Sequence, residues 1–144
     1  MIAQTIYDLA MDLMDEKKDL QQLTDTPVSD YDSTKDYQAR TPGILTILQT
    51  QIVMYLKSRG VDIDSLEKIE TLQDNVELDD DICSGVLPYG LAARLLGQED
   101  SVTSKEWMSS YFSNLAVAAE SSSDKMKGKQ VTRENIYGLF RAGD

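Results

Sequence analysis

The segment from Leu78 to Asp100, LDDDICSGVLPYGLAARLLGQED, constrains the fold more than any other part of this chain. It opens with Asp79, Asp80 and Asp81, whose carboxylates can accept from free backbone N–H groups and complement the positive end of a helix dipole. The apolar residues that follow lie mostly three or four positions apart, and they are Ile82, Val86, Tyr89, Leu91, Leu95 and Leu96. This spacing predicts a helix with one apolar face.

Pro88 lies in the middle of this apolar run, between Gly85 and Gly90. A proline inside a helix costs about 3 kcal/mol and tends to kink it. Glycines allow a second backbone to come close. Two interpretations follow: a buried helix with a kink, or a kinked helix that packs against another subunit.

Helical periodicity recurs in three other segments, and together they predict an all-α fold with about four main helices in one small bundle. The segments run from Ile2 to about Leu23, from Ser33 or Asp36 to Arg59, and from Ser101 or Thr103, the candidate caps, to Glu120. Thr41–Pro42 lies inside the second segment, so that helix is either kinked or newly started there. Residues 61–78 are strongly acidic and predict a long ordered loop, with room for a small hairpin. Such long loops usually have a function or contact a partner.

The aromatic cluster of the last helix, Trp107, Tyr111 and Phe112, has two interpretations. It is either part of the core or a set of exposed anchors, because large aromatic side chains are common hot spots at interfaces.

The chain changes character after Glu120, which divides it into a helical domain over residues 1–120 and a C-terminal part over 121–144. The stretch SSSDKMKGK predicts a flexible basic linker. Its basic cluster, with the residue that follows, is Lys125, Lys127, Lys129 and Arg133. This cluster is either solvated or contacts an acidic partner surface or DNA. The short apolar segment beyond it contains Ile136, Tyr137, Leu139 and Phe140, and either folds back on its own core or docks on a neighbouring subunit.

The composition argues against catalysis. The chain has 144 residues, which suits one domain, and 41% of them are hydrophobic, which is typical of a globular protein. It contains no histidine, and its single cysteine, Cys83, is expected to be a buried inert thiol. No phosphate-binding loop, dinucleotide motif or metal-ligand pattern occurs. We therefore expect no enzyme activity, no cofactor and no metal. No apolar run approaches the ~20 residues of a membrane span, so no membrane contact is expected.

The charge is unevenly distributed. Residues 1–100 hold 20 acidic and 8 basic side chains, a net charge of −12, whereas residues 101–144 carry +1. A body this acidic repels a nucleic-acid backbone.

Four segments resemble a group of phage structural proteins that are encoded near the capsid genes of tailed phages infecting Gram-positive bacteria. GVLPYGLAARLL, in the segment described first, is one of them, and DYQARTPGILTIL (36–48) is similar to the family's D-Y-x-A-R-T-P-x-I-L pattern. IYDLAMDLMDE (6–16) resembles the family's first helix. NIYG (135–138) resembles its closing D-V-Y-G element, with Asn135 in place of the acid.

This resemblance implies a head–tail connector, or adaptor, that forms a ring beneath the portal in the neck of the virion after synthesis in the host cytoplasm. The implied partners are the portal protein and the next neck or tail protein. The implied ring is a dodecamer through whose lumen DNA passes without specific binding. The candidate contacts with other subunits or with the portal are Pro88, Tyr89, Trp107, Tyr111, Ile136, Tyr137, Leu139 and Phe140. The competing hypothesis is a small acidic helical interaction or regulatory module that binds a basic protein partner.

Overall fold

The computed structural model describes residues 1–22, 31–97 and 100–130, with side chains described for 1–15, 35–97 and 100–121. The described residues form five helices and no strand: α1 (Ala3–Gln22), α2 (Tyr31–Ser58), α3 (Asp80–Gly85), α4 (Leu87–Leu96) and α5 (Ser101–Gln130). Four of them are long, and α3 has only six residues. The predicted all-α bundle with about four main helices is therefore confirmed.

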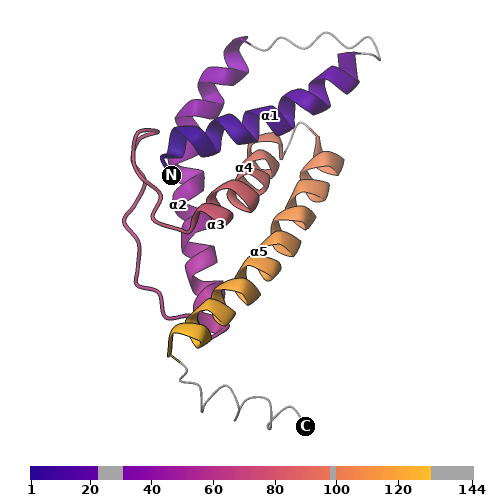
Figure 1. The fold of residues 1–144 in the computed structure, drawn as a ribbon. Helices are drawn as coiled ribbons and strands as arrows, with labels where there is room; N and C mark the ends of the chain where they lie inside the picture. Colours follow the sequence, from indigo (N-terminus) through magenta and orange to yellow (C-terminus); the bar gives the residue numbers. More distant parts are fainter. Residues whose placement is uncertain (23–30, 98–99, 131–144) are drawn as a thin grey trace.

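The bundle is built around α4, which contacts every other helix of the described chain (Figure 1). The reason lies in its sequence, because LPYGLAARLL is apolar on almost every side and a helix of that kind must be buried. Seven of its ten residues are buried: Leu87, Pro88, Gly90, Leu91, Ala92, Ala93 and Leu95. The amphipathic helices α1, α2 and α5 supply the apolar faces that surround it.

The prediction of one kinked helix around Pro88 was wrong. The helix ends at Gly85, the chain turns at Val86 (φ −120°, ψ −56°), and α4 begins at Leu87. Pro88 thus lies in the first turn of a new helix, where its missing N–H removes no intrahelical hydrogen bond. Asp79 occupies the N-cap position of α3, but its side chain makes no capping hydrogen bond.

Helix α2 continues through Pro42, so no new helix starts there. Hydroxyl groups on either side bond to the helix backbone: Thr41 Oγ1 donates to the carbonyl of Tyr37 (2.6 Å), and Thr46 Oγ1 donates to that of Pro42 (2.9 Å). The start of α5 also differs from expectation, because its cap is Asp100. The carboxylate of Asp100 accepts hydrogen bonds from the N–H and the hydroxyl of Thr103 (3.1 and 2.7 Å).

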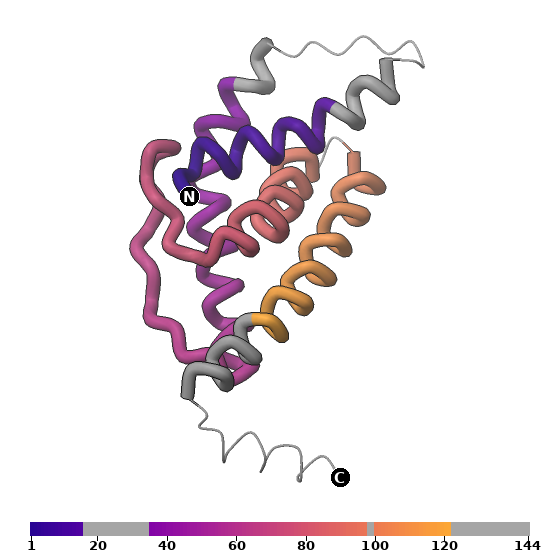
Figure 2. The backbone as a smooth tube through the Cα atoms, in the orientation of Figure 1, coloured from indigo at the N-terminus to yellow at the C-terminus, as the bar shows by residue number. Residues whose placement is uncertain are grey.

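The acidic segment between α2 and α3 is an ordered loop, as predicted, and runs along the outside of the bundle (Figure 2). Buried Ile69, Val76 and Leu78 anchor it to the core. It does not form the hairpin considered above. Its extended part pairs instead with the start of the chain: the N–H of Val76 donates to the carbonyl of Met1 (2.8 Å), and that of Ala3 donates to the carbonyl of Asp74 (2.9 Å).

The predicted end of the last helix near Glu120 was also wrong. Helix α5 extends to Gln130, so the part of the predicted linker from residue 121 to 130 is helical. Lysine is a good helix former, and serine is less favourable by only tenths of a kcal/mol per residue, so polarity alone did not mark a helix end.

At Gly90, α4 lies close to side chains of both α5 and α2. A Cβ at this position would lie 2.8 Å from Cδ2 and 3.0 Å from Cε2 of Tyr111, and 3.1 Å from Cδ1 of Leu48. Tyr111 is 1% exposed and Leu48 is fully buried, so a Cβ at position 90 would press on two side chains that are packed in the core. The absence of a side chain at Gly90 therefore sets the distance between these helices.

We predict that Gly90→Ala destabilises the protein by about 1–2 kcal/mol, because overpacking a core costs about 1–3 kcal/mol and the gain in helix propensity recovers at most about 1 kcal/mol. Gly43→Ala in α2 is the matched control, since a Cβ there meets nothing within 4 Å. It should stabilise the protein by about 0.5–1 kcal/mol. Urea unfolding of both variants measures the difference, and equal shifts in one direction would contradict the packing argument.

Candidate functional site

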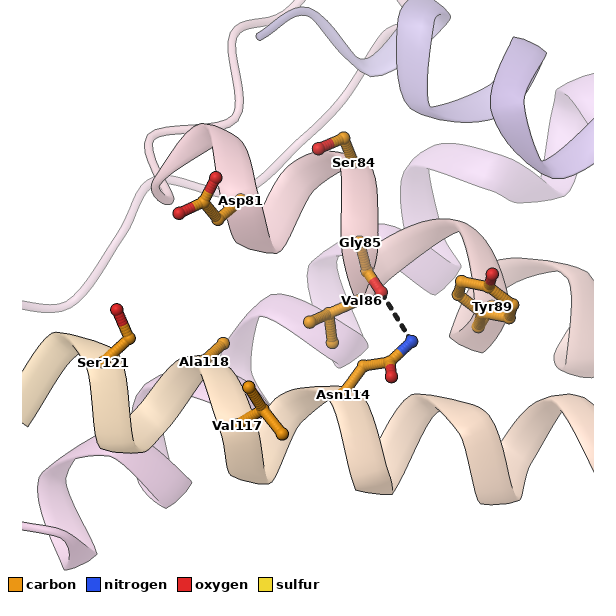
Figure 3. Close-up of a pocket in the computed structure, with 9 residues that line it drawn as sticks. All are labelled: Asp81, Ser84, Gly85, Val86, Tyr89, Asn114, Val117, Ala118 and Ser121. Atoms are coloured by element: carbon orange, nitrogen blue, oxygen red, sulfur yellow. Dashed lines mark hydrogen bonds between the residues drawn. The ribbon is translucent and has the colours of Figure 1, made fainter.

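A groove of about 440 Å³ lies where the α3–α4 junction faces α5 (Figure 3). Nine residues line it: Asp81, Ser84, Gly85, Val86, Tyr89, Asn114, Val117, Ala118 and Ser121. The groove exists because the chain breaks the helix at Val86 instead of continuing it. The end of α3 and the first turns of α4 then form one wall, and α5 forms the other.

One hydrogen bond fixes the two walls. The side-chain amide of Asn114 on α5 donates from Nδ2 to the carbonyl oxygen of Gly85 at 2.9 Å, the bond drawn in Figure 3. Gly85 is the last residue of α3, and carbonyls at a helix C-terminus have no partner within their own helix. Asn114 therefore satisfies a helix-end acceptor and holds α5 against the junction.

The lining has an apolar centre and a polar rim. Val86 is buried beneath the groove, Ala118 is half-buried, and Val117 is 67% exposed on the α5 side. The polar members are two hydroxyls, one amide, one phenol and the carboxylate of Asp81. An apolar centre within a polar rim is the general composition of a protein–protein contact.

Tyr89, predicted as a contact residue, is half-buried and lines the groove. Pro88 and Tyr111 do not fit their predicted role, because both are buried in the core of this chain and have no surface for a partner. Trp107 is partly buried and packs against the core. For Tyr111 and Trp107 the core interpretation of the aromatic cluster is therefore the correct one.

The exposed apolar residues of α5 were not identified from the sequence as a group. Val102 and Val117 are each 67% exposed and Phe112 is 59% exposed. Phe112 contacts the ring of Tyr111 edge-on, with centroids 5.2 Å apart, yet its own ring faces outward. The sequence feature that could have indicated their exposure is the helical step of about 100° per residue. This step places neighbours such as Tyr111 and Phe112 on different sides of the helix.

The remaining predicted contacts are only partly within the described chain. Lys125, Lys127 and Lys129 lie on the last turns of α5. Arg133 and the apolar residues Ile136, Tyr137, Leu139 and Phe140 lie outside the described residues.

Cys83 is fully buried and has the environment of an inert thiol, as predicted. Its Sγ lies 3.3 Å from the carbonyl oxygen of Leu78, to which it donates. Burial raises the pKa of the Cys83 thiol to about 11; the N-terminal ammonium group acts to lower this pKa, and the charges of Asp80 and Asp79 act to raise it. Around neutral pH the group is therefore an unreactive thiol, not a nucleophilic thiolate.

The described residues contain no group of three or more histidine, cysteine or acidic side chains placed to hold a metal ion. Within the same part of the chain, no helix combines the length and the apolar character that crossing a bilayer requires.

Comparison of the chain with protein-family models, with curated proteins and with solved structures gave no match.

We predict that Ellman's reagent, a disulfide, labels Cys83 at pH 8 more than about a hundredfold more slowly in the folded protein than in the urea-unfolded protein. The reason is that the raised pKa leaves about one thiol in a thousand ionised in the folded protein. The folded-state rate should increase as the pH approaches 11. Absorbance at 412 nm measures both rates. Rapid labelling of the folded protein at pH 8 would show that this helix opens readily.

Proposed function

We propose that this protein is a structural subunit of a phage head–tail connector, which assembles as a ring between the portal and the next neck or tail protein. The groove between the α3–α4 junction and α5 carries the proposal, because it offers an interface-like surface on a chain with no recognisable catalytic motif. The sequence resemblance supports it. Three of the four similar segments fall on α1, on α2, and on α4 with the junction before it, which are the elements that build the bundle and one wall of the groove.

A ring built from identical subunits needs two different surfaces on each subunit, one to receive and one to insert. The groove is the receiving surface in this proposal. The inserting element is the apolar C-terminal segment of a second copy, residues 134–140. The basic residues that precede the segment also suit the acidic body, whose net charge over residues 1–100 is −12.

The same charge fits a channel for DNA. An acidic wall repels the phosphate backbone, so DNA can pass without being held. In this proposal the ring contains twelve copies, as the resemblance implies, and its mechanism is contact alone. The strongly acidic body also fits the alternative function, a small regulatory module that binds a basic protein, and the two functions differ in assembly.

The direct test is mass and shape. Size exclusion with light scattering, followed by negative-stain imaging, is carried out with and without a purified candidate portal protein. Closed rings, formed alone or only on the portal, support the connector. A monomer that ignores the portal, together with capture of a basic protein by the purified chain, supports the regulatory module.

We predict that Val117→Arg abolishes ring assembly, because it places a charge in the apolar centre of the groove. Val102→Arg is the matched control, since Val102 is on the same helix and is equally exposed at 67% but does not line the groove. Both variants should keep a free energy of unfolding within about 0.5 kcal/mol of the original, as surface changes usually do. Light scattering of each variant mixed with the portal protein measures ring assembly. If Val117→Arg and Val102→Arg assemble equally well or equally poorly, the groove is not part of the interface.

We predict that the double substitution Tyr137→Ala and Phe140→Ala leaves the subunit folded and prevents assembly, because the inserting segment loses its two largest anchors. Thermal unfolding of the isolated chain is the control measurement. A large loss of thermal stability would instead show that the segment belongs to the chain's own core.

A further inference from the structure

A second cavity, of about 430 Å³, lies on a different side of α5, where that helix meets α2 and α4. Its lining is mainly apolar and aromatic: Gln51, Tyr55, Arg94, Met108, Tyr111, Phe112 and Leu115. Sites for small molecules commonly have this size and this combination of an apolar wall with a few polar groups. The cavity shares no lining residue with the groove described above.

Arg94 is the one charged residue among these seven, and its guanidinium is incompletely satisfied. Nε is buried and has no hydrogen-bond partner, and no ion pair joins Arg94 to a carboxylate of the described residues. Arg94 lies in the last turn of α4, where a cation is favoured by the helix dipole. The dipole accounts for a positive charge at this position, but it leaves the buried N–H without an acceptor.

Tyr111 adds a second unsatisfied group to the same wall. Its side chain is 1% exposed, and its hydroxyl is buried without a partner. Burial raises the pKa of Tyr111 to about 12, while the nearby Arg94 lowers it slightly. The hydroxyl therefore remains protonated around neutral pH. Leaving a buried donor unpaired costs about 1–3 kcal/mol, so two such groups beside one cavity call for an explanation.

The rest of the lining provides an apolar surface that can contact the hydrocarbon part of a ligand. Met108 and Leu115 pack partly or fully in the core, and Phe112 extends outward at the edge with 59% exposure. Tyr55 completes the opposite wall, and its ring is fixed by the guanidinium of Arg59 at 5.3 Å. An apolar group can therefore be enclosed between α2 and α5.

We propose that this cavity binds a small carboxylic acid with an apolar body, with the carboxylate at Arg94 and the body against Met108, Phe112 and Leu115. A carboxylate accepts two parallel hydrogen bonds from a guanidinium, so it pairs with the one charged side chain of this lining. This inference does not depend on ring assembly, because it concerns a separate surface of the single chain.

The test uses 3-phenylpropionate as the probe and the ¹³C-methyl signals of the methionines as the readout. Met108→Leu assigns the signal of Met108, which lines the cavity, and exposed Met54, which does not, serves as the internal reference. We expect a saturable shift of the Met108 signal with a dissociation constant of about 1 mM or tighter, a modest affinity for a ligand of this size. No shift up to tens of millimolar, or a shift without saturation, would overturn the proposal.

Two comparisons isolate the charge. The neutral 3-phenylpropionamide should bind at least about tenfold more weakly, because a charge-assisted pair is about twice as strong as a neutral hydrogen bond. For the same reason, Arg94→Gln should weaken the binding of 3-phenylpropionate by about the same factor. Lys68→Gln, which removes one exposed positive charge from the loop, is the matched control and should bind normally. Equal binding of acid and amide, or equal loss in both variants, would refute a specific carboxylate site. If Arg94→Gln does not fold, the comparison of the acid with the amide in the unaltered chain still tests whether the cavity recognises a carboxylate.

Discussion

The contact between Gly90 and Tyr111 determines the geometry of this molecule. Because α4 carries no side chain at that point, the aromatic ring of α5 lies directly on its backbone, with Leu48 of α2 beside it. Both candidate sites depend on this distance. Tyr89, next to Gly90, lines the groove on one side of α5, and Tyr111 itself lines the cavity shared with α2. One missing side chain thus sets the spacing of two surfaces with different chemistry.

The sequence predicted those features that follow from periodicity. The apolar spacing in Leu78–Asp100 and in the other helical segments predicted helices packed on one core, and the density of acids between residues 61 and 78 predicted a loop. Pro88 was misjudged because a proline is compatible with two arrangements, a kink or the first turn of a new helix. Only the packing of α3 and α4 distinguishes them. The helix end near Glu120 was misjudged because a polar stretch can be a linker or a solvated helix.

The candidate surfaces were harder to predict, because they depend on which side of a helix faces the core. Tyr111 and Phe112 are adjacent and chemically similar, yet one is buried and the other exposed. Tyr89 borders the groove, and that surface results from the break at Val86 and not from a kink. The cavity beside Arg94 combines residues from three helices, so no local pattern indicates it.

The pairing of the acidic loop with the first residues of the chain has a consequence for the order of folding. The α4–α5 contact joins segments that are close in sequence. The hydrogen bonds from Ala3 to Asp74 and from Val76 to Met1 instead close a chain of more than about 70 residues. Closing so long a segment carries an entropic cost before any contact compensates for it, so such contacts tend to form late. We therefore expect the helical core to assemble first, with the loop and the N-terminus joining last and opening first in the native state. The buried residues of the acidic loop would then complete the core after the helices have packed.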